Sequence, residues 1–326
     1  MSDHGAGDRT GVDGDVRVRQ ARSEDYDAVV SFTEDTWPGR GSDYIPRIYH
    51  EWIAGDGDDQ RTFVAEHGER VAGICQGVLL SEYEAWAQGM RIDPEFRGEG
   101  LGILLNDALF DWAVANGASV CRNMVFSWNE AGLGMSRTAG FDPRMEFRWA
   151  HPEPNAKVDP DLPVHEEPDA AWSYWQRSDA RDALRGLALD GDESWAVSAL
   201  SHADLRNAAD ETRVFAVGDG GTAGLAYRVR DYEREVTSED ENDEHEADDG
   251  TERWAEYGVG AWADVESARS LFEAIAADAA VIGADRTRVL VPETPRHVSD
   301  VAACRVETSA EPDFVFETDL TNRIDR

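Results

Sequence analysis

Glycine and arginine recur between residues 97 and 102 with a spacing that suits phosphate binding. The segment Arg97–Gly102 reads RGEGLG; it follows an apolar, strand-like stretch and precedes an amphipathic one. A glycine turn that opens a helix presents unpaired backbone N–H groups and the positive end of the helix dipole. Glycine is needed because side chains would block the approach of a phosphate and disfavour positive φ. The segment therefore predicts an anion site at a strand–turn–helix junction.

The surrounding pattern predicts the elements that hold this turn. Apolar residues recur at helical spacing from Leu101 to Trp112, and Gly117 ends that helix. The first helix of the chain begins at Ser23 and is expected to end near Trp37-Pro38-Gly39. The other expected helices are 44–53 and 129–139, and the expected strands are 16–21, 62–66, 71–80, 85–92, 119–126 and 141–150.

Several short motifs in this order carry a family resemblance. Arg97-x-x-Gly100-x-Gly102 resembles the pyrophosphate loop of the GNAT acetyltransferases, and Ile92-Asp93-Pro94 resembles the strand end before it. Asn129 followed by Gly140-Phe141 resembles that family's N-x-x-A…G-F pattern, and Arg19–Asp25 resembles its opening segment. The resemblance covers about residues 16–150. It implies an α/β (α+β) domain with a mixed, mostly antiparallel sheet flanked by helices.

The resemblance also implies a cofactor and its contacts. The cofactor is acetyl-CoA, whose acetyl group passes to an amine. Backbone N–H groups at the end of a splayed strand would bind the thioester carbonyl, and Asn129 would lie near the pantetheine arm or simply cap its helix. The residues implied in cofactor binding are Met90, Ile92, Arg97, Gly98, Gly100, Leu101, Gly102 and Asn129.

Two proton-handling roles are harder to assign. The family's tyrosine, five residues before the Phe of the G-F pair, falls on Ser136, which departs from the pattern. A serine hydroxyl can donate a hydrogen bond to a leaving thiolate but is a weaker acid; the alternative is an ordinary small helix residue. Glu84, just before the strand that leads to the cofactor site, is the candidate general base; the alternative, favoured by the many surface acids of this chain, is a solvated charge.

The second half looks like a degenerate copy of the first. Residues 151–169 form a proline-rich linker, and residues 170–326 repeat parts of the first domain at offsets of 151 and 166, with an acidic loop at 231–253. At offset 166, Asp264 and Glu266 stand where glycines of the phosphate turn should be. This copy is therefore not expected to bind CoA. Its central helix should direct Leu271 and Ile275 toward a sheet.

The net charge of −36, from 67 acidic and 31 basic residues, excludes nucleic acid and anionic membranes as partners. The acids are spread along the whole chain, and Lys157 is the only lysine, which favours a halophilic host with a salt-rich cytoplasm. No apolar run could span a membrane, residues 1–15 look disordered, and the histidines lack metal-ligand spacing. Three separated cysteines suit a reducing cytoplasm.

The sequence thus predicts a cytoplasmic tandem GNAT N-acetyltransferase in which the amine attacks acetyl-CoA directly. The acceptor is a small-molecule amine or a protein or peptide amine. The alternative is a non-catalytic acyl-CoA-binding module whose second domain offers a partner-binding surface. Because two GNAT domains in one chain can imitate a dimer, both a monomeric pseudo-dimer and a homodimer remain open.

Overall fold

A computed structural model describes residues 9–10, 16–34, 36–37, 43–235 and 250–324 of the chain. The expectations of disorder before residue 16, of a helix end at Pro38-Gly39 and of a mobile segment within 231–253 lie wholly or partly outside these residues. The chain divides into two compact units. Unit 1 comprises residues 1–125, 129–143 and 315–326, and unit 2 comprises residues 126–128 and 144–314.

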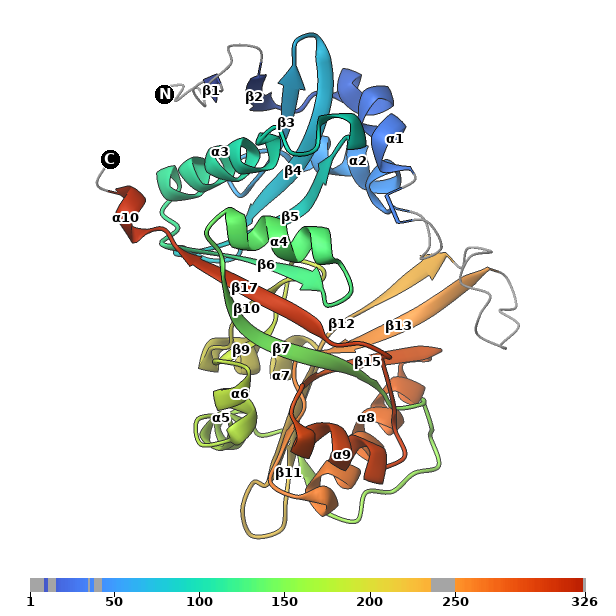
Figure 1. Ribbon diagram of the computed structural model, residues 1–326. Helices are drawn as coiled ribbons and strands as arrows, with labels where there is room; N and C mark the ends of the chain where they lie inside the picture. The colour runs from blue at the N-terminus through green and yellow to red at the C-terminus, as the bar shows by residue number, and fades with distance from the viewer. Residues whose placement is uncertain (1–8, 11–15, 35, 38–42, 236–249, 325–326) are drawn as a thin grey trace. The chain divides into compact units, whose positions relative to one another are not determined.

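Unit 1 contains one sheet with strands in the order β1-β2-β3-β4-β5-β6-β17 (Figure 1). The strands are β1 (Arg9–Thr10), β2 (Val16–Gln20), β3 (Gln60–His67), β4 (Arg70–Leu79), β5 (Glu84–Ile92), β6 (Val120–Phe126) and β17 (Asp313–Asp319). The helices are α1 (Tyr26–Thr33), α2 (Ile45–Gly55), α3 (Leu101–Ala115), α4 (Glu130–Thr138) and α10 (Thr321–Ile324), with short 3-10 turns η1 (Ser23–Asp25) and η2 (Pro94–Phe96). Most predicted elements are confirmed to within a few residues; α1, however, ends before the expected Trp37.

Helices cover both faces of this sheet. Successive side chains of β4 point to opposite faces, so β4 contacts the helices on each side. A Cβ placed on Gly73 or Gly77 would meet Leu105 or Trp112 of α3, so this face of β4 packs directly on that helix. Ile74, which points the other way, belongs to the buried cluster formed with α1 and α2. Leu105 is itself fully buried, as its helical spacing predicted.

Unit 2 repeats this arrangement, with strands in the order β7-β15-β13-β12-β11-β8. The strands are β7 (Asp142–His151), β8 (Val164–His165), β11 (Arg213–Val217), β12 (Gly224–Glu235), β13 (Thr251–Tyr257), β14 (Ala261–Trp262), β15 (Arg286–Pro292) and β16 (Glu307–Thr308), with a separate hairpin of β9 (Leu187–Leu189) and β10 (Val197–Ala199). The helices are α5 (Pro168–Trp175), α6 (Asp179–Ala183), α7 (His202–Glu211), α8 (Val265–Val281) and α9 (Pro295–Ala303).

The repeat predicted from the sequence has a close structural counterpart. The bounds of β6 shifted by 166 residues are those of β15, and α8 ends at the residue that the same shift gives for α3. Each unit contains a parallel strand pair, β5 with β6 in unit 1 and β13 with β15 in unit 2, beside antiparallel pairs such as β4 with β5 and β12 with β13. Leu271 and Ile275 are fully buried in a core cluster with residues of β11, β13 and β15, as predicted. The predicted mixed-sheet fold class is confirmed.

The last strand of each sheet differs from the expectation. The stretch 141–150 was expected to close the first sheet, but β7 pairs Phe147–Ala150 with Val289–Pro292 of β15, inside unit 2. The first sheet instead includes β17, from the end of the chain. The expected linker 151–169 also contributes β8, which pairs with β11. β7 and β17 each mix apolar with charged residues, and such patterns do not specify which sheet a strand joins.

Candidate acetyl-CoA site

The glycine turn of unit 1 has the conformation that its sequence predicted. Gly98 and Gly100 have φ of 86° and 84°, in the left-handed region that favours glycine. Gly100 is the N-cap of α3, and a Cβ at either glycine would meet no atom within 4 Å. No acidic residue lies in the first turn of α3, and no side chain caps it. The first turn of this helix therefore has no side-chain cap at the positive end of the helix dipole.

Arg97 adds a positive charge beside this turn. It is exposed, and within the described residues it makes no ion pair or side-chain hydrogen bond. The carboxylate of Glu99, by contrast, lies 3.3 Å from His67 Nε2. The turn thus combines unpaired backbone donors with a cation, which is the donor set that a pyrophosphate requires.

A bulge re-aims the end of β5, where Met90 and Ile92 were predicted to act. Pairing of β4 with β5 steps from Gln76↔Gln88 to Ile74↔Arg91, so Gly89 and Met90 together oppose a single residue. Gly89 has φ 64°, and a Cβ on it would lie 2.4 Å from the ring of Trp52. Glycine is therefore required here both by backbone conformation and by close packing.

β5 and β6 part shortly before this bulge. Their parallel ladder runs only from Glu84↔Val120 to Trp86↔Arg122. Past it, the facing backbone groups of Ala87–Ile92 and of β6 from Asn123 onward have no ladder with each other among the described residues. A strand gap of this kind offers backbone donors and acceptors to an extended ligand.

The outer end of β5 is tied to the segment before α2. Arg91 Nε donates to Asp43 Oδ2 at 2.6 Å, and the Asp43 side chain is fully buried. The Arg91 guanidinium also lies 4.3 Å from the ring centroid of Trp37. This ion pair was not predicted, because nothing in the sequence relates two residues so far apart.

α4 lies on the same face of the sheet as the glycine turn, because Met135 packs against Gly102. Asn129 is its N-cap and accepts a hydrogen bond from Gly132 N at 3.0 Å, so the capping alternative is realised. Ser136 is buried, and its Oγ lies 3.0 Å from Asn123 Nδ2. Asn123 was missed in the sequence, since no motif marks it.

Glu84 lies elsewhere. It is 2% exposed at the beginning of β5, where Arg122 forms an ion pair with it and Ser81 Oγ donates to it at 3.1 Å. Arg122 is also paired with Glu317 of β17, at 2.6 Å. Six residues of extended strand separate Glu84 from Met90, roughly 20 Å. The structure therefore brings Glu84 into a buried ion-pair cluster and not to the glycine turn.

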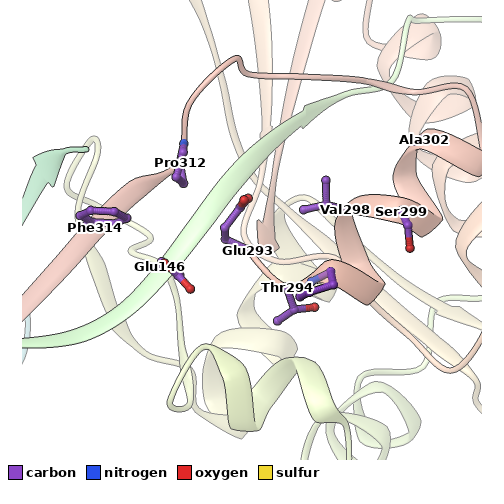
Figure 2. A pocket seen from close by; sticks show the side chains of 9 residues that line it. Glu146, Glu293, Thr294, Val298, Ser299, Ala302, Pro312 and Phe314 are labelled. Carbon is purple, nitrogen blue, oxygen red and sulfur yellow. The ribbon is translucent and has the colours of Figure 1, made fainter. Parts of the chain in front are cut away.

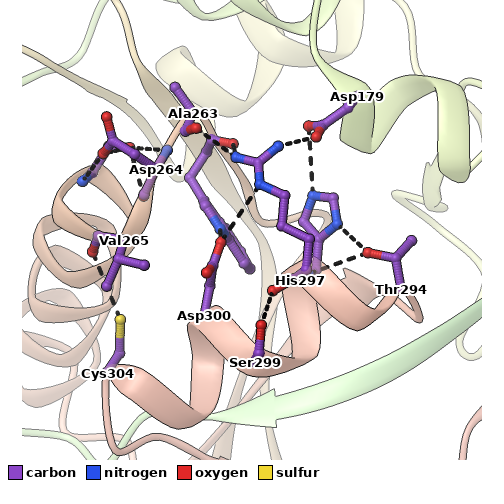
Figure 3. Close-up of polar contacts among 12 residues, drawn as sticks. Asp179, Ala263, Asp264, Val265, Thr294, His297, Ser299, Asp300 and Cys304 are labelled. Atoms are coloured by element: carbon purple, nitrogen blue, oxygen red, sulfur yellow. Dashed lines mark hydrogen bonds and ion pairs between the residues drawn. The ribbon is translucent and has the colours of Figure 1, made fainter.

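The corresponding helix of unit 2, α8, begins differently. The first turn of α8 is closed by Asp264, whose Oδ1 accepts from Ser267 N at 2.9 Å, a bond that holds the pKa of this carboxyl below its usual range. Arg296 donates to the carbonyl oxygen of Ala263 at 2.5 Å and forms an ion pair with Asp179 (Figure 3). A carboxylate and a guanidinium of the protein itself thus lie at the beginning of α8.

The strand gap is also absent from unit 2. β13 and β15 pair from Trp254↔Arg286 to Tyr257↔Val289, and Gly260 N then donates to Leu290 O at 2.8 Å. An open pocket of about 490 Å3 does occur in this unit, between α9, β7 and the beginning of β17 (Figure 2). Val298, Phe314 and Glu146 line it, and it contains none of the predicted site residues.

Two other features, a metal cluster and a membrane-spanning helix, are absent from the described residues. There, no group of three or more His, Cys, Asp and Glu side chains is arranged to hold a metal ion. None of the helices in the same part of the chain is both long enough and apolar enough to cross a bilayer.

Comparisons with known proteins agree with this geometry. Residues 26–141 match the model of the acetyltransferase (GNAT) family. Over 94% of this chain and 96% of the other, the fold resembles a GCN5-related N-acetyltransferase from Sphaerobacter thermophilus, with a TM-score of 0.58 at 10% identity. A putative acetyltransferase from Thermoplasma acidophilum gives a TM-score of 0.53 at 16% identity, over 93% of this chain and 99% of the other. A search of curated proteins found no match.

The matched segment contains the glycine turn, the strand gap and α4, so its family assignment and its geometry concern the same part of the chain. Residues 26–141 are thus a GNAT acetyltransferase domain, and a domain of this family takes acetyl-CoA as its acyl donor. The two full-length likenesses extend the GNAT-like fold across both units. A GNAT domain also implies an amine acceptor.

Proposed function

We propose that unit 1 transfers an acetyl group from acetyl-CoA to the amine of a small molecule or of a protein or peptide, by direct attack. The observation that carries this proposal is the combination, in one unit, of the uncapped glycine turn before α3 and the gap between β5 and β6. One feature can hold a pyrophosphate and the other an extended arm. We further propose that unit 2 is a degenerate GNAT copy with an architectural role.

The residues of unit 1 divide the work as follows. N–H groups of Gly98–Gly102 and the side chain of Arg97 hold the pyrophosphate, and backbone N–H groups of Met90–Ile92 polarise the thioester carbonyl. Acetyl-CoA supplies an acetyl thioester: the amine nitrogen bonds to its carbonyl carbon, the carbon–sulfur bond breaks, and the electron pair leaves on sulfur. Ser136 stabilises the leaving sulfur by donating a hydrogen bond.

Two earlier assignments change in this proposal. Asn129 contributes by capping α4 and so fixing the helix that carries Ser136. Glu84 is a structural residue, because its carboxylate already has Arg122 and Ser81 as partners. The amine therefore gives up its proton to solvent, and the thiolate is protonated from solvent.

The wider setting is also a proposal. Cys75 and Cys121 are buried free thiols, and Cys304 is half-buried, which suits a reducing cytoplasm. The charge of −36 suits a halophilic host. The chain would act as a monomeric pseudo-dimer or as a homodimer, without nucleic acid or membrane.

The test of the cofactor site is Gly100→Glu, which places a carboxylate and a strained backbone in the phosphate cradle. We expect calorimetry in high salt to show no CoA binding to a folded variant. The matched control is Gly283→Glu, since Gly283 also has positive φ (71°) and no neighbour within 4 Å, but lies in unit 2. If Gly100→Glu binds CoA with the same affinity as Gly283→Glu and the wild type, the site assignment is wrong.

The amine chemistry needs its own experiment. A broad panel of small amines and peptides, incubated with acetyl-CoA and assayed for CoA release, should identify an accepted class. If the protein binds CoA but releases none with any member of the panel, the non-catalytic binding module is the better description.

A further inference from the structure

Asn123 is the first residue of β6 after its ladder with β5 ends. Its Nδ2 donates to Ser136 Oγ at 3.0 Å. Its Oδ1 is buried and has no hydrogen-bond partner among the described residues. Whichever way the amide is turned, one of its polar atoms meets Ser136 and the other stays unpaired. Buried polar groups nearly always have partners, so the unpaired atom offers a contact to a ligand at this place.

The pairing decides what Ser136 can do. A hydroxyl group has one proton to donate and two lone pairs to accept with. Because Asn123 Nδ2 uses a lone pair of Ser136 Oγ, the proton of that hydroxyl remains available to another acceptor. Ser136 is 4% exposed, so that acceptor has to be a group that enters the site rather than bulk water.

A comparison with unit 2 distinguishes residue pairs that the fold needs from pairs that the acetyl-CoA site needs. At offset 166, Arg122 falls on Arg288, which also forms a buried ion pair with a glutamate of the neighbouring parallel strand, Glu256. The same offset places Val289 at the position of Asn123 and Ala302 at that of Ser136. The fold therefore retains the Arg–Glu pair in both units. The Asn–Ser pair is missing from the unit whose phosphate position is blocked.

We propose that Asn123 is a positioning residue for acyl transfer. Its Nδ2 holds Ser136 so that the hydroxyl donates to the sulfur of CoA, and its Oδ1 accepts an amide N–H of the bound pantetheine arm. Binding of acetyl-CoA thus fixes the orientation of the Asn123 side-chain amide, and that amide fixes the orientation of the Ser136 hydroxyl. When the carbon–sulfur bond breaks, the electron pair stays on sulfur, Ser136 keeps its proton while donating, and the thiolate is later protonated from solvent. This inference rests on the proposed function.

The thiol of bound CoA provides a readout that needs no acceptor. A hydrogen bond donated to the thiolate lowers the pKa of the thiol, by about one unit for a bond to a charged group. That pKa is measured from the rate at which iodoacetamide alkylates CoA in the complex across a pH series, with free CoA as reference. Protein thiols interfere little, because burial raises the pKa of Cys304 to about 11 and raises those of Cys75 and Cys121 further.

Three variants of the full chain distinguish the two hydrogen bonds of the Asn123 amide, one to Ser136 and one to the pantetheine arm. Ser136→Ala should abolish the lowering of the thiol pKa and leave CoA affinity unchanged. Asn123→Ala should abolish the same shift and also weaken CoA binding by about tenfold, because the Oδ1 contact is lost. Asn123→Asp keeps the shape but has an acceptor on both sides. Its carboxylate should accept the hydrogen bond donated by the Ser136 hydroxyl, and its negative charge should raise the thiol pKa above that in the other variants.

The control is Asn116→Ala, which removes an amide bonded to Trp112 O at the far end of α3 and should change neither quantity. Circular dichroism and calorimetry establish that each variant is folded and binds CoA. If Asn123→Ala keeps the lowered pKa that Ser136→Ala loses, or if Asn123→Asp behaves like Asn123→Ala, the inference is overturned. Bound CoA with the thiol pKa of free CoA also overturns it. Failure of the wild type to bind CoA overturns the proposed function itself.

Discussion

Gly89 is a single residue on which the shape of the site depends. Its φ of 64° suits glycine, and an added Cβ would lie 2.4 Å from Trp52, a buried residue of α2. Gly89→Ala should therefore destabilise the protein by about 2–4 kcal/mol, from strain and from displacement of the indole. It should also lower activity, because the bulge aims the N–H groups of Met90–Ile92.

The matched control for this variant is Gly134→Ala. Gly134 is helical in α4, with no atom within 4 Å of an added Cβ, so alanine should be neutral or stabilising by about 0.5–1 kcal/mol. Urea denaturation of both variants checks the contrast. Equal stability of Gly89→Ala and the wild type would contradict the assigned role of the bulge.

Asp313 makes a pH-dependent contribution to stability. Its carboxyl is buried and accepts a hydrogen bond from Trp149 Nε1 at 3.1 Å. Burial raises its pKa from 3.8 to about 6. The folded state thus binds this proton more tightly than the unfolded state, so stability falls as pH rises from about 4 to about 6.

Asp313→Asn keeps an acceptor for Trp149 and removes this titration. Above pH 6 the variant should be more stable than the wild type by about 1–3 kcal/mol, and the difference should shrink toward pH 4. The opposite slope expected from His297, whose pKa burial lowers to about 4, is common to both proteins and cancels in the comparison. Thermal unfolding at both ends of this pH range, at constant high salt, measures the difference. A variant that is less stable at every pH would contradict the assigned cause.

At the scale of elements, the sequence predicted what local pattern determines. The turn at Gly100 and the helix after it follow from glycine spacing and helical periodicity, and the structure has both. The capping role of Asn129 could also be foreseen. Asn123 could not be foreseen, because its importance comes from a strand gap and from a partner on another element. The bulge at Gly89 has a signal in the sequence, because a glycine inside a strand often marks a bulge.

The exchanged closing strands were beyond sequence analysis for a different reason. An alternating apolar strand specifies which face is buried but not which neighbour it pairs with. Unit 1 acquires Glu317 from β17 and Arg323 from α10; Arg323 bonds to Asp107 of α3 at 2.5 Å. The end of the chain thus supplies partners to residues that precede it by about two hundred positions.

This topology predicts that a fragment of residues 1–155 is not self-sufficient. It lacks β17, so β6 would become an open edge and Arg122 would lose one of its two carboxylate partners while buried. We expect it to aggregate and to bind no CoA. Joining residues 1–143 to 315–326 through a flexible Gly/Ser linker should restore solubility, circular dichroism and CoA binding. The outcome that would count against the topology is a soluble 1–155 fragment with the CoA affinity of the full chain.

At the scale of the whole molecule, charge is the dominant property. The chain has 67 acidic residues against 31 basic ones, and many acids sit in buried or half-buried ion pairs such as Arg122–Glu84 and Arg91–Asp43. The remaining acids repel one another in the folded state. Salt shortens the Debye length from about 10 Å at 0.1 M to about 3 Å at 1 M, which weakens this repulsion.

The fold should therefore require salt, with a thermal midpoint that rises steeply between 0.1 and 1 M KCl. A fourfold variant, Glu51→Gln, Asp58→Asn, Asp59→Asn and Glu82→Gln, removes exposed acids of unit 1 and should show a smaller rise with a higher midpoint at low salt. Sucrose, which favours compact states without screening charge, should not reproduce the difference between the two proteins. Thermal unfolding followed by circular dichroism measures the midpoint of both proteins across the KCl series and in sucrose. A midpoint that does not rise with KCl, or one that rises equally in both proteins, would mean that charge repulsion does not limit the stability of this molecule.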